Sequence, residues 1–243
     1  MANDRKQLPT RPAPGSEVER FLSEVAAAPT LRAPGTRGRL VFAMDATASR
    51  EPTWDRACRL QAEMFRETEA LGGLDVQLVF YRGFGECKAS RWHSEPATLR
   101  RAMTAVTCLG GQTQIGKVLR HVLTETRRQK VNALVFVGDA FEEEIDRVCA
   151  AAGELGVLGV PAFMFHEGRD PIARKAFEQV ARLTGGACCP FDASSAQQLR
   201  DLLRAVAVFA AGGRPALEHY GRRHGGEAAR LSAQLKSLPR SGR

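Results

Sequence analysis

The sequence predicts an α/β fold: a Rossmann-like, mostly parallel six-stranded sheet that is flanked by helices and has one antiparallel edge strand. Two observations predict this fold. Short apolar runs alternate along the chain with longer segments whose apolar residues recur at helical spacing. The apolar runs are also continuous rather than alternating, which is typical of parallel strands buried on both faces. With 243 residues, the chain has room for one such domain and for tails.

The six strands are predicted at residues 40–44, 76–81, 86–92, 133–137, 161–165 and 187–189. The helices are predicted at residues 51–71, 96–106, 115–128, 142–155, 172–183 and 196–209. The longest helix has Trp54, Leu60 and Met64 near helical spacing and is expected to end at Gly72-Gly73. The run 86–92 follows a glycine-containing turn and is therefore predicted to return as the antiparallel edge strand.

The sequence divides into three parts. Residues 1–38 begin with a polar, proline-rich stretch that predicts disorder, followed by a short helix at 18–28 and a linker. Residues 39–209 contain the strand and helix pattern and form the predicted domain. Residues 210–243 form a basic C-terminal tail.

The composition and charge of the chain argue against several classes of function. The chain has no run of 18 or more apolar residues, so no transmembrane helix is predicted. The first 15 residues lack the apolar core of a secretory signal, and we therefore expect a cytoplasmic protein. The net charge of +8 is concentrated in the tails, because residues 39–209 hold 22 basic and 21 acidic residues. A nearly neutral domain does not favour nucleic-acid binding, although a basic-tail binder remains an alternative that deletion of 210–243 tests.

The six cysteines show neither a C-x-x-C pair nor another zinc-binding spacing. They are expected to be reduced and partly buried, with a redox role of the adjacent Cys188 and Cys189 as the alternative. The five histidines also show no metal-ligand spacing.

Oxygen-bearing side chains gather where predicted strands end. Asp45, Thr47 and Ser49 alternate directly after the first strand, and Asp139 follows the strand 133–137. The carboxyl ends of parallel strands meet at one edge of the sheet, where ligands of such folds bind. Thr113 adds another hydroxyl from a Gly-rich turn. Carboxylates and hydroxyls are ligands for hard cations such as Mg²⁺.

Together these residues resemble the metal-ion-dependent adhesion site of von Willebrand factor A (VWA) domains. The family pattern is D-x-S-x-S after the first strand, a Thr in a later Gly-rich loop, and an Asp after the fourth strand. The resemblance covers about residues 39–209 and includes two departures. Thr47 replaces the usual Ser, and Gln112 stands where Gly is common; neither change removes a ligand.

The resemblance implies a role for each residue. Thr47 and Ser49 would bind Mg²⁺ or Mn²⁺ directly through their hydroxyls, whereas Asp45 and Asp139 would hold it largely through water. Thr113 would bind directly in one conformational state and through water in another. The remaining coordination position would be open to the carboxylate of a protein partner.

Two simpler interpretations compete with this site. Asp45, Thr47 and Ser49 could merely cap the helix that begins near residue 51. Residues 111–118, GQTQIGKV, also nearly match a phosphate-binding loop, but Val118 stands where that loop needs a Ser or Thr for Mg²⁺. Lys117 is then expected to be a solvated helix residue.

The predicted function is a cation-dependent protein-binding module and not an enzyme, because the site lacks an obvious base or nucleophile. Intracellular members of the family often act beside ATPases or in the assembly of larger complexes. The resemblance therefore implies that this protein also acts in such a complex. The alternative is a metal-dependent hydrolase, with Glu142 or His166 as the candidate general base. The sequence indicates neither the partner nor the oligomeric state.

Overall fold

The structure is a computed structural model, and it describes residues 37–66, 68, 73–191 and 196–223. Its centre is a six-stranded sheet with the strand order β3-β2-β1-β4-β5-β6. The strands are β1 (Gly38–Asp45), β2 (Leu74–Arg82), β3 (Glu86–His93), β4 (Ala133–Gly138), β5 (Ala162–Glu167) and β6 (Ala187–Phe191). Only β3 is antiparallel to its neighbour, so the predicted sheet is confirmed.

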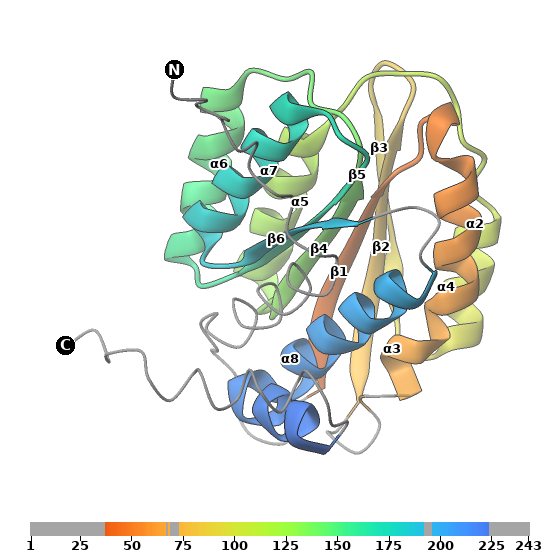
Figure 1. The fold of residues 1–243 in the computed structure, drawn as a ribbon, viewed down its shortest axis with the longest axis vertical. Coiled ribbons are helices and arrows are strands. Elements are labelled where there is room, and N and C mark those ends of the chain that lie inside the picture. The colour runs from red at the N-terminus through yellow and green to blue at the C-terminus, as the bar shows by residue number, and fades with distance from the viewer. Residues whose placement is uncertain (1–36, 67, 69–72, 192–195, 224–243) are drawn as a thin grey trace, which may run out of the picture.

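Helices cover both faces of this sheet (Figure 1). One face packs against α2 (Glu51–Leu60), α3 (Ala62–Arg66), α4 (Pro96–Thr104) and α8 (Ala196–Arg223). The other face packs against α5 (Ile115–Arg128), α6 (Ile145–Val157) and α7 (Pro171–Thr184). All eight residues of β1 are buried, and successive side chains enter opposite cores, which explains its continuous apolar sequence.

The helix predicted over residues 51–71 is divided into α2 and α3. At the junction, the Met64 amide donates to the Gln61 carbonyl three residues back, a tighter turn than the α-helical bond. After α3, the Thr68 hydroxyl donates to the carbonyls of Met64 and Phe65 and so competes with a further helical turn. Helix α3 ends at Arg66, and residues 67 and 69–72 of the predicted continuation to Gly72-Gly73 lie outside the described residues.

The last described helix is longer than predicted. Helix α8 continues past Phe209, with Ala210 and Ala211 buried and a kink at Gly213, so the boundary predicted at residue 209 falls inside it. Gly38 at the start of β1 permits this packing, because a Cβ atom there would lie 2.4 Å from the Ala210 carbonyl oxygen. None of the described helices is long and apolar enough to cross a membrane. The predicted disorder and helix within residues 1–36, and residues 224–243 of the tail, lie outside the described residues.

Candidate functional site

The candidate site begins at the carboxyl end of the central strand β1. Asp45 is the last residue of that strand and is only 1% exposed. Its Oδ1 atom accepts a hydrogen bond of 2.7 Å from the backbone amide of Thr47. This local bond turns the chain sharply after the strand and fixes the orientation of the carboxylate.

The two hydroxyls that follow point toward a second carboxylate. Thr47 Oγ1 and Ser49 Oγ lie 3.5 Å apart, and Ser49 Oγ donates to Asp139 Oδ2 over 3.4 Å. Adjacent ligands of an octahedral Mg²⁺ ion lie about 3.0 Å apart when each is at about 2.1 Å from the metal. The spacing of these three oxygens is thus close to that of a coordination shell, and the donor set fits a hard divalent cation.

Helix capping does not account for this arrangement. Thr47 precedes a short 3-10 helix (Ala48–Arg50) without a side-chain capping bond, and Arg50 precedes α2 in the same way. The hydroxyls of Thr47 and Ser49 are therefore not used as helix caps.

Thr113 lies in the loop between α4 and α5 and is joined to the segment after β4. Its amide donates to Glu142 Oε2 over 3.1 Å, and its hydroxyl accepts from the Glu142 amide over 2.9 Å. The loop is held in place by bonds from Leu109 to the Ala46 carbonyl and from Gln112 to the Gly83 carbonyl. The structure thus links Asp45, Thr47, Ser49 and Asp139 by direct contacts, and connects Thr113 through Glu142.

The loop depends on a glycine where it meets the β2–β3 turn. A Cβ atom at Gly111 would lie 2.2 Å from the Gly83 carbonyl oxygen, so only glycine permits this approach. The family resemblance places Gln112 at a position where Gly is common, and here that residue is exposed and uses its amide for the bond to Gly83.

A buried charge network underlies the site, and the sequence did not reveal it. Arg50 is 2% exposed, donates to Glu167 at the end of β5, and lies 3.7 Å from Asp139 Oδ2. The Thr53 hydroxyl lies 2.7 and 2.8 Å from the two Glu167 oxygens. Because Arg50 and Glu167 are 117 residues apart, no local spacing indicates their contact.

Burial and the neighbouring charges shift the pKa values of two groups at the site. Burial raises the pKa of Asp45, and the negative charge of the nearby Asp139 raises it further. The hydrogen bond from the Thr47 amide and the positive charge of Arg50 lower that pKa, but they do not cancel the rise. Burial, and after it the charge of Asp45, raise the pKa of Tyr81 on β2 well above its usual value. A cation at the site would favour the ionised form of Asp45.

Glu142 and Glu143 explain why α6 begins at Ile145 and not at the predicted residue 142. The Glu143 carboxylate accepts from the backbone amides of Ile115 and Gly116, the latter over 2.9 Å, and so caps α5 instead. Acidic side chains favour a helix N-terminus, and Glu143 serves that of α5 and not that of the helix that follows it.

Replacing Glu143 by Ala is expected to lower the free energy of unfolding by about 1 kcal/mol, because α5 has no other side-chain cap. Urea denaturation measures the change. Glu144→Ala is the matched control, since Glu144 only pairs with Arg147 at the surface and its loss is expected to cost less than about 0.5 kcal/mol. Equal effects of the two variants would contradict the capping role.

The competing motifs have other roles in the structure. Lys117 is exposed, as expected, but its Nζ donates to the Gly85 carbonyl and to Gln114 Oε1, both at 2.8 Å. No strand precedes the loop at residues 105–114, so the context of a phosphate-binding loop is missing. His166 is 1% exposed and packs edge-on against Phe177 with ring centroids 5.5 Å apart, so it lies in the core and does not line a crevice.

Cys188 and Cys189 belong to the cores on opposite faces of the sheet, which fits burial and not a joint redox role. Trp54 is buried and its indole N–H donates to the Met103 carbonyl, so it packs in the core. Within the described part of the chain, no group of three or more His, Cys, Asp or Glu side chains is placed to hold a metal ion. The candidate site has two carboxylates, and its other ligands would be hydroxyls.

The fold and this site define an α/β domain with carboxylates and hydroxyls at the ends of its central strands. Among solved structures, it is similar to the VWA domain of SpRpn10, with a TM-score of 0.54 at 12% identity over 69% of this chain and 94% of that one. It is also similar to the von Willebrand factor domain of the type V pili tip protein Mfa5 from Porphyromonas gingivalis. That comparison has a TM-score of 0.53 at 12% identity and covers 72% of this chain and 95% of that one.

A third similar structure is proximal thread matrix protein 1 from the mussel byssus, described with zinc in its metal-ion-dependent adhesion site. It gives a TM-score of 0.53 at 15% identity and covers 71% of this chain, which spans 48% of that protein. No family model matches the sequence, and no curated protein matches it. The chain has the fold of a VWA domain.

Proposed function

We propose that this VWA-type module binds a divalent cation, Mg²⁺ or Mn²⁺, and uses it to capture an acidic side chain of a partner protein. The observation that carries the proposal is the contact of Ser49 with both Thr47 and Asp139 at the carboxyl end of β1. Thr47, Ser49 and Thr113 would supply hydroxyl ligands, and Asp45 and Asp139 would hold the ion through water and hydrogen bonds. The zinc-occupied site of the mussel protein supports the use of a divalent cation.

Exposed apolar side chains near the site support a protein partner. Phe84 at the tip of the β2–β3 turn is 86% exposed, and Leu109 in the α4–α5 loop is 46% exposed. The loop of Leu109 is bonded to Ala46, next to Asp45, and is in contact with the turn of Phe84 through Gly111. Large exposed apolar groups beside a polar centre are typical of protein-interaction surfaces.

No specific observation favours a hydrolase. Of the two candidate bases, Glu142 is engaged by the Thr113 amide and His166 is buried beside Phe177. A hydrolase would need a base within about 3 Å of a metal-bound water. Turnover of generic phosphate esters by the wild type, lost in Glu142→Ala or His166→Ala, would favour the alternative.

The test is a calorimetric titration of Mg²⁺ and Mn²⁺ into metal-stripped protein, followed by titration of short peptides that carry one Glu or Asp among apolar residues. We expect the metal to bind, and the acidic peptides to bind only when the metal is present. Matched peptides with Gln or Asn are expected to bind at least about tenfold more weakly, because they lack the charge that completes the metal shell.

Phe84→Ser separates metal binding from peptide binding, since the Phe84 side chain is exposed and is not a proposed metal ligand. It is expected to retain metal binding and to weaken peptide binding by about tenfold, a typical loss for an aromatic anchor. Peptide binding that is equal with Gln and with Glu would refute capture through the metal.

A further inference from the structure

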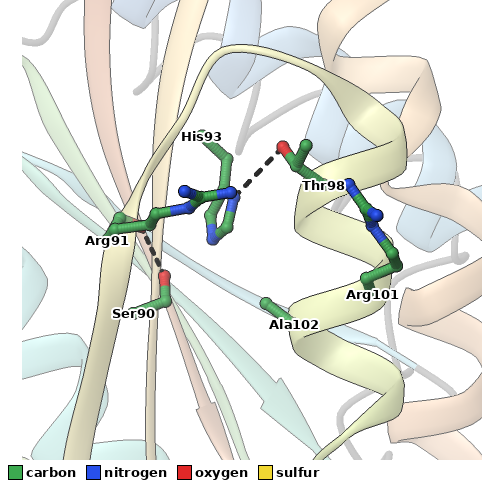
Figure 2. Close-up of a pocket in the computed structure, with 6 residues that line it drawn as sticks. All are labelled: Ser90, Arg91, His93, Thr98, Arg101 and Ala102. Atoms are coloured by element: carbon green, nitrogen blue, oxygen red, sulfur yellow. Dashed lines mark hydrogen bonds between the residues drawn. The ribbon is translucent and has the colours of Figure 1, made fainter.

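A second polar site lies at the sheet edge between β3 and α4. A groove of about 430 Å³ is lined there by Ser90, Arg91, His93, Thr98, Arg101 and Ala102. Figure 2 shows the Arg91 side chain reaching from β3 toward the helix beside the His93 ring, with Arg101 on the facing helix. Among the residues that the structure describes, no acidic side chain lines this groove.

A bulge in the edge strand gives the groove its lining. The pairing register of β2 and β3 shifts between Gln77 and Val79, so Leu78 faces two residues, Ser90 and Arg91. Ser90 Oγ accepts a hydrogen bond of 3.0 Å from the Leu78 amide. This bond replaces the backbone hydrogen bond between strands that the bulge interrupts. Bulges re-aim side chains at sheet edges, and here Ser90 and Arg91 line the same groove as His93.

The hydrogen bonds of His93 define what its ring offers to the groove. The Thr98 hydroxyl donates to the Glu95 carbonyl over 2.9 Å, so it accepts from His93 Nδ1 at 3.1 Å. In the neutral ring, Nε2 is consequently an acceptor. His93 is 5% exposed, and its Nε2 has no hydrogen-bond partner among the described residues. An unpaired polar atom at such depth is uncommon and indicates a missing partner.

The charges around the groove are uncompensated. Neither Arg91 nor Arg101 forms a salt bridge with a described carboxylate. Two acidic side chains of the neighbouring strands are bonded elsewhere, because Glu86 pairs with Arg82 and Lys88 and Asp75 accepts from Arg37 and Ser94. Burial, and after it the charge of Arg91, lower the pKa of His93, so the ring is neutral at neutral pH.

We propose that this groove binds a tetrahedral oxyanion, either free phosphate or the phosphate group of a small molecule. Arg91 and Arg101 supply the positive charge from opposite walls, and the anion takes a hydrogen bond from His93 Nε2 once that atom carries a proton. The bound anion neutralises the repulsion from Arg91 and thereby favours the protonated ring. Binding is therefore coupled to proton uptake and is tighter at lower pH.

The groove is separate from the proposed metal site. His93 pairs with Val76 and Asp45 pairs with Tyr81, and these two β2 positions are five residues, or about 16 Å, apart. Anion binding at the groove accordingly needs no divalent cation and is independent of the proposed function.

The experiment is a calorimetric titration of sodium sulfate into the full chain between pH 5.5 and 8, in a buffer without other multivalent anions. Sulfate keeps its charge over this range, so a change in affinity with pH reflects protonation of the protein and not of the anion. We expect affinity to rise by about tenfold from pH 8 to pH 5.5 in the wild type, and to be independent of pH in His93→Gln.

Arg91→Ala and Arg101→Ala are each expected to weaken sulfate binding by about tenfold, as for loss of a charged hydrogen bond. Arg100→Ala is the matched control, because Arg100 lies on the same helix but does not line the groove. Since Arg91 and Arg101 are exposed, thermal unfolding without sulfate is expected to be unchanged in both variants.

Inorganic phosphate and phenyl phosphate, compared at one pH, distinguish the two sources of the anion: tighter binding of the ester indicates a small-molecule phosphate, and tighter binding of phosphate the free ion. The proposal is overturned if the wild type binds none of these anions, or if the Arg91→Ala/Arg101→Ala variant binds sulfate as tightly as Arg100→Ala does.

Discussion

Replacing Arg50 by Ala is expected to lower the free energy of unfolding by about 3 to 5 kcal/mol. The substitution leaves the Glu167 carboxylate buried, with the Thr53 hydroxyl as its remaining partner among the contacts described above. A buried charge that loses its counter-charge retains its full desolvation cost, which is why such losses are among the largest that single substitutions cause. Urea denaturation at neutral pH, followed by tryptophan fluorescence, measures the effect.

Two comparisons test whether the unpaired Glu167 charge causes the loss of stability in Arg50→Ala. In Arg50→Ala/Glu167→Gln, the amide still accepts from Thr53 and no charge is left buried, so we expect part of the lost stability to be recovered. Arg147→Ala removes an arginine from an exposed ion pair with Glu144 and is expected to cost less than about 1 kcal/mol. A double variant no more stable than Arg50→Ala would show that packing, and not the unpaired charge, causes the loss.

The fold was predictable because its signals are local. Strands β1, β4 and β5 are apolar runs buried along their whole length, and the more exposed antiparallel β3 follows β2 across a short turn. The helix Ile115–Arg128 was predicted at its observed bounds, because its apolar residues recur at helical spacing and its last turn is basic. Helix ends were less accurate where the bonds of one side chain decided them: the Thr68 hydroxyl bonds back to Met64 after α3, and Glu143 caps α5 instead of beginning α6.

The candidate site was only partly predictable. The positions of Asp45 and Asp139 at the ends of neighbouring strands follow from the topology of a parallel sheet. Arg50 was not indicated, because a charged residue at the start of an amphipathic helix is usually solvated. Its burial results from Glu167, which belongs to a strand that lies two positions away in the sheet. The groove at β3 was also missed, because a β-bulge has no clear signal in a single sequence.

Arg50 has a consequence for the proposed cation site as well. Its guanidinium lies 3.7 Å from Asp139 Oδ2 and so already places one positive charge beside a predicted metal-coordinating group. A divalent ion held by the same carboxylate would be repelled by this charge, and the repulsion is strong where water is excluded. The site is therefore expected to bind its cation more weakly than the same ligands would without the arginine, which leaves room for a partner's carboxylate to complete the binding.

Asp45→Asn is expected to abolish Mg²⁺ binding while leaving the metal-free protein at least as stable as the wild type. The amide oxygen of Asn can still accept from the Thr47 amide, so the turn after β1 is preserved. The charge it removes is buried and lies near Asp139, and burial raises the pKa of Asp45. An acid whose pKa is raised by folding stabilises the protein only while protonated, and this contribution is lost as the pH rises through the folded-state pKa.

The measurement combines calorimetric titration of Mg²⁺ with thermal unfolding in EDTA and in excess Mg²⁺, at neutral pH. Wild-type protein is expected to be stabilised by Mg²⁺, by an amount that grows with the logarithm of the Mg²⁺ concentration above the Kd, and Asp45→Asn is expected to show no such shift. Asp170→Asn is the control, because that carboxylate only caps α7 at the surface and an amide can cap it equally well. A variant that loses Mg²⁺ binding and also unfolds at a lower temperature in EDTA would mean that Asp45 holds the fold together. Loss of binding without loss of stability would mean that the chain maintains a buried carboxylate at the end of β1 for its ligand, at the expense of its own stability.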